Sequence, residues 1–240
     1  SMIRHLKIMP SPRFAVNSVI DQVGLLTQDH ATVRNIRQVY RHYKYAVGSA
    51  VAADFSKAYC HGDVEIEMVG VWDTVKALGL RWPVVWRWSQ PAHDFHNHHL
   101  GNSIRHGYHA LALDETRMAF EPVMWDSPSQ WQGEMEQVWF RGCHSDIGGN
   151  LGDYTVARPL SNIPLVWMLE KLAGCGVRLP DNYATRFITD PQAPAVGSYR
   201  GWSKMFFWRR RRVIGADASE HLHPSAQGHK NANRVGGRAI

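Results

Sequence analysis

Residues 63–75, DVEIEMVGVWDTV, are the stretch that decides the fold. Charged and apolar residues alternate at first, and from Met68 the run becomes almost continuously apolar. This change is typical of a strand in a parallel sheet, where helices cover both faces. The apolar run ends at Asp73, so the sequence predicts a carboxylate at the carboxyl end of a buried strand.

The segments on either side of this strand alternate between helical and strand-like patterns. In chain order the predicted elements are helices over 12–26 and 30–48, the strand over 63–75, a segment 103–120 that is helical through Leu113, a second strand over 134–142, and a helix over 160–176. The sequence therefore predicts an α/β fold with a mainly parallel sheet flanked by helices. We expect a single domain over residues 1–240, with a frayed tail over 228–240.

The composition narrows the class of protein. Of the 240 residues, 44% are hydrophobic and 20% are charged, which is typical of a globular chain. Because there is neither a signal-peptide pattern nor a run of 18 apolar residues, no signal peptide and no transmembrane helix are predicted. The 3 cysteines show no CxxC spacing, which favours free thiols in a reducing compartment. The net charge is +6, but no nucleic-acid-binding motif accompanies it, so no nucleic-acid partner is predicted.

Two residues with catalytic side chains directly follow predicted strands. Asp73 ends the first strand and His144 lies just after the second, in "RGCHSDIGGN" (141–150). Functional residues of parallel sheets collect at these strand ends, and α/β-hydrolases order their triad as nucleophile, acid, histidine. The acid would orient the imidazole, and the imidazole would take the proton of the nucleophile. Simpler roles stay open, since Asp73 could cap a helix and His144 could be a turn residue.

Three blocks of the sequence resemble one known family. "VGVWDTVKALG", "HGYHALALDETRMAFEPVMW" and "QVWFRGCHSDIGGNLGD…LSNIPLVWMLEKL" together look like the α/β-hydrolase family that includes phospholipase effectors of bacterial type VI secretion. The late "HLHPSA" (221–226) resembles that family's closing element. The resemblance implies that Asp73 is the triad acid and His144 the triad base, with Asp146, Gly148 and Gly149 shaping the loop that presents His144.

The same resemblance implies a setting for the protein. It suggests a bacterial cytoplasmic protein that is delivered to a target cell, with a phospholipid or membrane surface as partner. Apart from the resemblance, no cofactor is predicted and no residue is assigned as a metal ligand. An immunity protein or a component of the secretion apparatus would be a second partner. The oligomeric state is not predicted.

The sequence departs from the family at the nucleophile. Members carry a G-F-S-R-G-A elbow before a helix like the one predicted here, yet no G-x-S-x-G occurs in the 240 residues. Counting back from Phe14 places the nucleophile position on Pro10, next to Ser11. The strained elbow needs small neighbours, which Pro10 and Pro12 do not supply, so Ser11 is only a weak candidate nucleophile.

This difference favours an N-terminally truncated α/β-hydrolase domain that is weakly active or inactive alone. The strand over 64–72 would then have an unpaired edge. The alternative is a non-catalytic protein that keeps the hydrolase scaffold for binding, as a partner subunit or as an immunity-type inhibitor.

Other clusters offer competing sites. "HDFHNHHLG" places His93, His96, His98 and His99 within one stretch that could hold Zn²⁺ or Ni²⁺, although a histidine-rich surface loop is favoured. His106 and His109 are expected to pack and bridge. Cys143 is not expected to act as a nucleophile with His144, because adjacent strand residues point in opposite directions.

An aromatic and basic stretch near the carboxyl end suggests lipid contact. In "KMFFWRRRR" (204–212), aromatic side chains could lie at a bilayer interface and arginines could bind anionic headgroups. The candidate contact residues are Phe206, Phe207, Trp208, Arg209 and Arg210. The alternative, which is favoured, is a core aromatic strand followed by a solvated run of charges.

Overall fold

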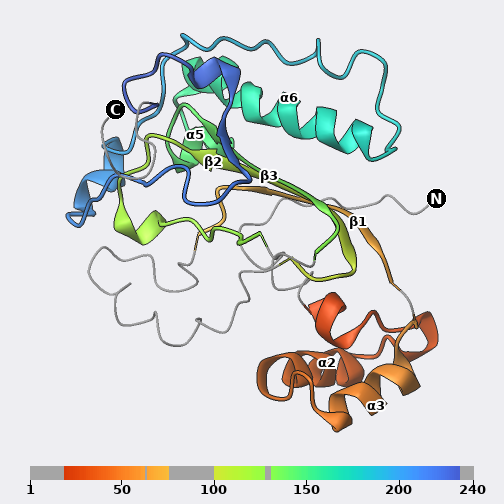
Figure 1. Cartoon of the computed structure of the whole chain (residues 1–240). Helices are drawn as coiled ribbons and strands as arrows, with labels where there is room; N and C mark the ends of the chain where they lie inside the picture. Colours follow the sequence, from red (N-terminus) through yellow and green to blue (C-terminus); the bar gives the residue numbers. More distant parts are fainter. Residues whose placement is uncertain (1–18, 63, 76–99, 128–130, 233–240) are drawn as a thin grey trace.

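The computed structural model describes residues 19–62, 64–75, 100–127 and 131–232 (Figure 1). Its centre is a four-stranded sheet in which neighbouring strands are all parallel, in the order β1-β2-β3-β4. The strands are β1 (Ile66–Trp72), β2 (Ile104–Ala112), β3 (Glu134–Phe140) and β4 (Glu220–Leu222). The predicted α/β fold, a mainly parallel sheet flanked by helices, is confirmed.

The prediction of a helix within 103–120 is wrong, because this segment forms the interior strand β2. β2 pairs with β1 on one side and with β3 on the other. Ala110, Leu111 and Ala112 are completely buried. Alanine and leucine favour helices in isolation, but burial on both faces of a parallel sheet overrides that preference.

Helix α6 (Arg158–Gly174) covers one face of the sheet (Figure 1). Its Trp167 packs edge-on against Tyr108 of β2 and Phe140 of β3, within one buried apolar cluster. The predicted helix over 160–176 is thus confirmed, with bounds two residues earlier. A separate buried cluster contains Val69 of β1 and Trp125.

The segment before β1 forms a small helical lobe with a core of its own. The lobe contains helices α2 (Val33–Tyr45) and α3 (Ala50–Tyr59). Their N-cap residues are Thr32 and Ser49, whose hydroxyls accept hydrogen bonds from backbone N–H groups in the first turn. The lobe core consists of Val23, Val39, Tyr43, Phe55 and Cys60. The predicted helix over 30–48 is therefore shorter than expected. Of the predicted helix over 12–26, residues 19–23 are helical in the described part.

β1 is an outer strand of the sheet, and in the described residues no other strand than β2 pairs with it. At the other end of the chain, the predicted frayed tail is partly attached. The side chains of His229 and Asn231 bind the Asp114 carboxylate at 2.7 and 2.5 Å, and Ala232 is buried. Across the described residues, no helix is long and apolar enough to cross a membrane.

Candidate active site

Asp73 and His144 meet at the carboxyl edge of the sheet. Asp73 follows β1 directly, and His144 is the first residue of α5 (His144–Ile147), the short helix after β3. The His144 ring nitrogen Nδ1 lies 2.7 Å from Asp73 Oδ2. Because an ionised carboxylate only accepts hydrogen bonds, Nδ1 carries the proton in this contact.

Asp73 has an unusual backbone conformation. Its φ of 43° places it in the left-handed region, which non-glycine residues rarely adopt. Its N–H donates to the Ala110 carbonyl at 2.7 Å, so strand pairing with β2 continues through this residue. Strain of this kind at a strand end is common at functional sites.

The Asp73 carboxylate is completely buried and fully paired. Besides His144, it accepts a hydrogen bond from the Ala112 N–H at 2.9 Å and forms an ion pair with Arg212. Burial acts to raise the pKa of Asp73, but the Arg212 charge and the hydrogen bonds of His144 and Arg212 outweigh it. The pKa of Asp73 is therefore well below its usual range, and the group stays ionised.

Arg212 is the residue of this site that sequence reasoning missed. Its guanidinium also donates to the carbonyl oxygens of Ala112 at 2.8 Å and Phe120 at 2.6 Å, and its side chain is 7% exposed. The sequence suggested a solvated charge run, since Arg212 is the last of four consecutive arginines. The one local signal in the sequence is that two apolar residues, Val213 and Ile214, directly follow Arg212.

The loop after β3 holds His144 by buried polar contacts. The Asp146 carboxylate accepts from the N–H groups of Cys143 at 2.9 Å and Val196 at 2.8 Å. Gly142 has a φ of 118°, and a side chain there would lie 2.7 Å from Asp146 Cβ, so only glycine fits. Gly148 ends α5, and Gly149 follows with a φ of 75°.

Glu115, which lies in the segment after β2, supports the same loop. Its Oε2 accepts the His144 backbone N–H at 3.2 Å, and it forms an ion pair with Arg117 at 2.6 Å. Burial acts to raise the pKa of Glu115, but the hydrogen bond and charge of Arg117 outweigh it and lower the pKa. The guanidinium of Arg117 also lies over the Phe120 ring at 3.9 Å, and that ring is 5.0 Å from His144.

The second nitrogen of His144 is free to act on a substrate or nucleophile. In the part of the chain that the structure describes, Nε2 makes no hydrogen bond, and the side chain is 23% exposed. Ser11 lies outside the described residues. The arrangement therefore supplies an oriented imidazole whose free nitrogen can accept a proton.

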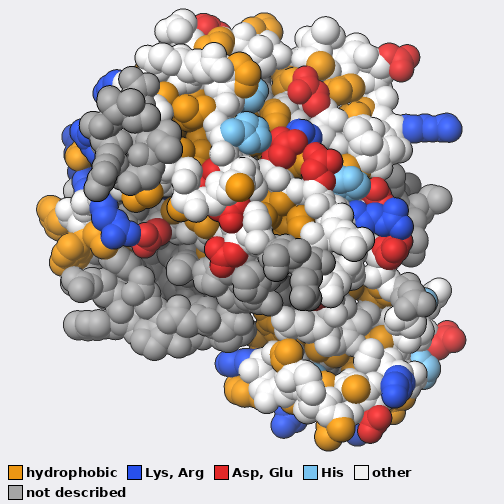
Figure 2. Space-filling view, in the orientation of Figure 1, with side chains coloured by type: hydrophobic (Ala, Val, Ile, Leu, Met, Phe, Trp, Pro, Cys, Tyr) orange, Lys and Arg blue, Asp and Glu red, His pale blue; other side chains and the backbone are white. Residues whose placement is uncertain are grey.

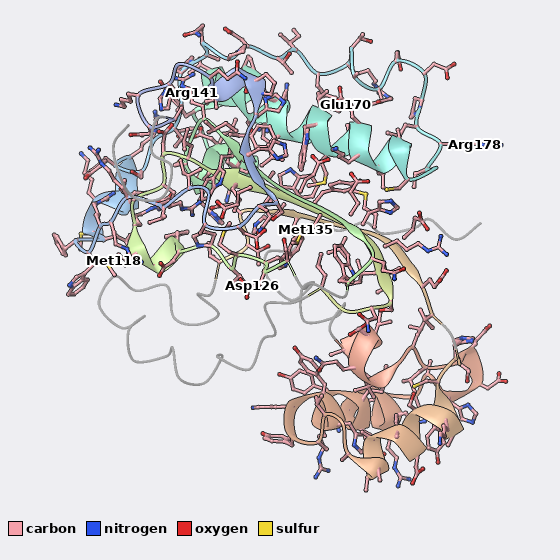
Figure 3. The ribbon with its side chains drawn as sticks, viewed as in Figure 1. Met118, Asp126, Met135, Arg141, Glu170 and Arg178 are labelled. Carbon is pink, nitrogen blue, oxygen red and sulfur yellow. The ribbon has the colours of Figure 1, made fainter. Side chains whose placement is uncertain are left out.

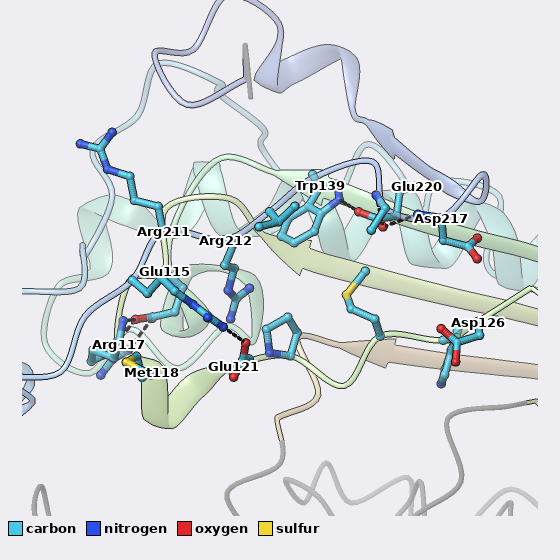
Figure 4. A pocket seen from close by; sticks show the side chains of 16 residues that line it. Glu115, Arg117, Met118, Glu121, Asp126, Trp139, Arg211, Arg212, Asp217 and Glu220 are labelled. Atoms are coloured by element: carbon cyan, nitrogen blue, oxygen red, sulfur yellow. Dashed lines mark hydrogen bonds and ion pairs between the residues drawn. The ribbon is translucent and has the colours of Figure 1, made fainter. Parts of the chain in front are cut away.

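A cavity of about 250 Å³ adjoins the supports of this pair (Figure 4). Its lining includes Glu115 and Arg212, which contact His144 and Asp73, together with Trp125 and Trp139. Arg211 lies on the same wall, but its guanidinium points away from that of Arg212 (Figure 4). The cavity wall thus contains the charged groups that hold the acid and the histidine loop.

Two of the five candidate lipid-contact residues face inward. Phe206 is buried against Ala119, and the Arg209 guanidinium binds Thr116, Ser198 and Ser203. These two side chains are not available to a bilayer. Arg210 is exposed and pairs with Glu121. Phe207 and Trp208 are exposed.

Of the competing histidine sites, the structure describes the one on β2. His109 lies on β2, is completely buried, and accepts the Thr74 N–H through Nε2 at 3.2 Å. Burial, which is the largest influence, lowers its pKa to about 4. The stretch with His93, His96, His98 and His99 lies outside the described residues. Within the described ranges, no group of three or more potential ligands could hold a metal ion.

Cys143 should not react with thiol reagents in the folded protein. It is completely buried at the start of α5, and burial, together with the charges of Asp146 and Glu115, raises its pKa to about 12. At pH 8 we expect a disulfide reagent to modify Cys175, which is partly exposed, and to leave Cys143 intact until denaturant is added. Peptide mass spectrometry would measure both sites. Rapid native labelling of Cys143 would contradict this prediction.

One of three comparisons with known proteins found a match. The family model described as "T6SS, Phospholipase effector Tle1-like, catalytic domain" matches residues 13–171, which include Asp73 and His144 but not Arg212. A search of curated proteins and a search of solved structures each found no match. The family match covers well over half of the chain. The chain therefore belongs to the Tle1-like family of type VI secretion phospholipase effectors, within its catalytic domain.

Proposed function

We propose that Asp73 and His144 are the acid and base of a serine hydrolase that cleaves carboxylic esters of phospholipids. The observation that carries this proposal is the 2.7 Å contact between His144 Nδ1 and the buried Asp73 carboxylate, while Nε2 makes no hydrogen bond within the described residues. The family match supports a lipid substrate and delivery to a target cell. An immunity or secretion-apparatus protein would be a further partner.

The proposed reaction is an acyl transfer in two steps. A serine hydroxyl attacks the ester carbonyl while His144 Nε2 takes its proton, and His144 then returns that proton to the leaving alcohol. Water, activated by the same nitrogen, releases the fatty acid and restores the serine. Asp73 keeps the proton on Nδ1 and stabilises the imidazolium. Arg212 acts through Asp73, as a positioning residue that keeps the acid ionised and aligned.

The nucleophile is the open part of this proposal. No G-x-S-x-G occurs in the sequence, and Ser11 is the candidate nearest the expected position. We therefore expect this chain to hydrolyse phospholipids only slowly by itself.

The direct test is release of a fluorescent fatty acid from phospholipid vesicles. We expect slow release by the wild-type chain and a fall to the protein-free background in His144→Ala, since the general base is lost. Circular dichroism would establish that both proteins are folded. A fluorophosphonate probe, followed by peptide mapping, would identify the reactive serine, and Ser11→Ala would test that candidate. Equal inactivity of two folded proteins would contradict catalysis by this chain.

The second candidate function is binding without catalysis. The absence of G-x-S-x-G favours it, because the Asp73–His144 pair could then be a retained part of a binding scaffold. In that case neither protein would release fatty acid and no serine would react with the probe.

A further inference from the structure

One row of apolar side chains on α2 faces solvent. Val33, Ile36 and Tyr40 are 67%, 55% and 50% exposed. Their spacing of three and four residues places them along one side of the helix. The same helix buries Val39 and Tyr43 in the lobe core, so these three residues are not needed to hold the lobe together.

A cationic row adjoins the apolar row. α2, VRNIRQVYRHYKY, contains Arg34, Arg37, Arg41 and Lys44 and no acidic residue. At 100° per residue, Arg37 and Lys44 project next to Val33 and Tyr40, and the other two arginines lie beyond them. Among the described residues, the three arginines form no ion pair. Figure 2 shows hydrophobic and basic side chains side by side on the surface of this lobe.

The turn after α2 and the start of α3 also expose apolar side chains. Tyr45, Val47 and Val51 are 74%, 50% and 66% exposed. An ordinary solvated helix places charges of both signs on its outer face, whereas this one combines exposed apolar residues with charges of one sign. A partner bound through phosphates alone would use the arginines and leave the apolar row in water.

We propose that the outer face of α2 is a docking surface for an anionic phospholipid bilayer. Val33, Ile36 and Tyr40 enter the boundary between headgroups and acyl chains, and Arg34, Arg37 and Arg41 bind the lipid phosphates, as in interfacial amphipathic helices. The inference rests on the proposed function, because it brings a lipid esterase to its substrate. Bilayer contact is thereby assigned to α2 and not to Phe206 and Arg209, whose side chains face inward.

The test measures sedimentation of the whole chain with vesicles, in the His144→Ala background so that the lipid stays intact. Vesicles contain phosphatidylcholine alone or with 30% phosphatidylglycerol, used here as the probe. We expect binding to the anionic vesicles that weakens as salt rises. Each basic residue near an anionic surface contributes about 1 kcal/mol, about fivefold, so Arg34→Gln, Arg37→Gln and Arg41→Gln together should weaken binding by about 100-fold. Ile36→Ser with Tyr40→Ser should weaken it by about tenfold.

Matched controls separate this surface from net charge. Arg178, Arg186 and Lys230 are exposed and lie outside the lobe, and Arg178 projects into solvent beyond the end of α6 (Figure 3). Their triple substitution by Gln removes the same charge and should change binding less than threefold. Ile188→Ser, at a residue that is 76% exposed, is the apolar control and should have no effect.

Three outcomes would overturn the proposal: no wild-type binding at low salt, equal binding to both vesicle types, or equal weakening in the control triple. A separate assay with a short-chain soluble ester measures hydrolysis without a bilayer. Failure of docking is thereby distinguished from failure of the proposed esterase activity.

Discussion

Arg212→Met should lower the free energy of unfolding by about 3–5 kcal/mol at pH 7, the usual cost of leaving one partner of a buried ion pair unpaired. The Asp73 carboxylate is completely buried, so without Arg212 its charge would be compensated only by His144 and one backbone N–H. The carbonyls of Ala112 and Phe120 would also lose their donor. Urea denaturation of the folded protein would measure the change.

The pH dependence of this loss has a defined sign. In the wild type the pKa of Asp73 is below its unfolded value, so its contribution to stability is present above about pH 4 and is lost below that. In Arg212→Met, burial should raise the pKa of Asp73 above the unfolded value. The stability difference between the two proteins should therefore shrink as the pH falls from 7 to 5. Burial lowers the pKa of His109 to about 4 in the wild type, and the Arg212 charge acts in the same direction. Loss of Arg212 should ease the protonation of His109, which also shrinks the stability difference as the pH falls.

Two further variants isolate the charge of Arg212. Arg211→Met removes the neighbouring exposed arginine and should change stability by less than about 0.5 kcal/mol. Adding Asp73→Asn to Arg212→Met should recover part of the loss, because no unpaired charge is then buried. Equal effects of the substitutions at 211 and 212 would show that the Asp73–Arg212 pair has no special energetic role.

Glu115→Gln should be comparably destabilising, by about 3 kcal/mol or more. The carboxylate accepts from Arg117 Nε at 2.8 Å and Nη2 at 2.6 Å, and from the N–H groups of Thr116, Arg117 and His144. A glutamine amide would direct its NH₂ group at one of these donors and would leave the Arg117 charge unpaired. Arg117 is 6% exposed, so water cannot replace the lost partner.

The matched control is Glu121→Gln, which removes a carboxylate from the exposed pair with Arg210. Exposed pairs contribute little, so its effect should stay below about 1 kcal/mol in the same denaturation assay. Similar losses for the two glutamate variants would contradict the buried network at Glu115.

Much of the fold could be predicted from local patterns. The run 63–75 and the segment 134–142 have the apolar composition of buried strands, and both form strands of one parallel sheet, with β2 between them. The sequence predicts the helix that forms α6, because apolar residues in 160–176 recur at helical spacing over several turns. β2 was mistaken for a helix because its alanines and leucine fit either structure, and only its position between β1 and β3 decides for a strand.

The sequence by itself determined that Asp73 and His144 follow buried strands, and parallel strands bring their carboxyl ends to one edge. The direct contact between the two side chains, by contrast, depends on register and on the left-handed backbone at Asp73. Only the tertiary structure decided which arginine of 209–212 pairs with Asp73. Four identical neighbours have the same local propensity, and Arg212 differs from the others because the fold directs its guanidinium onto a buried carboxylate.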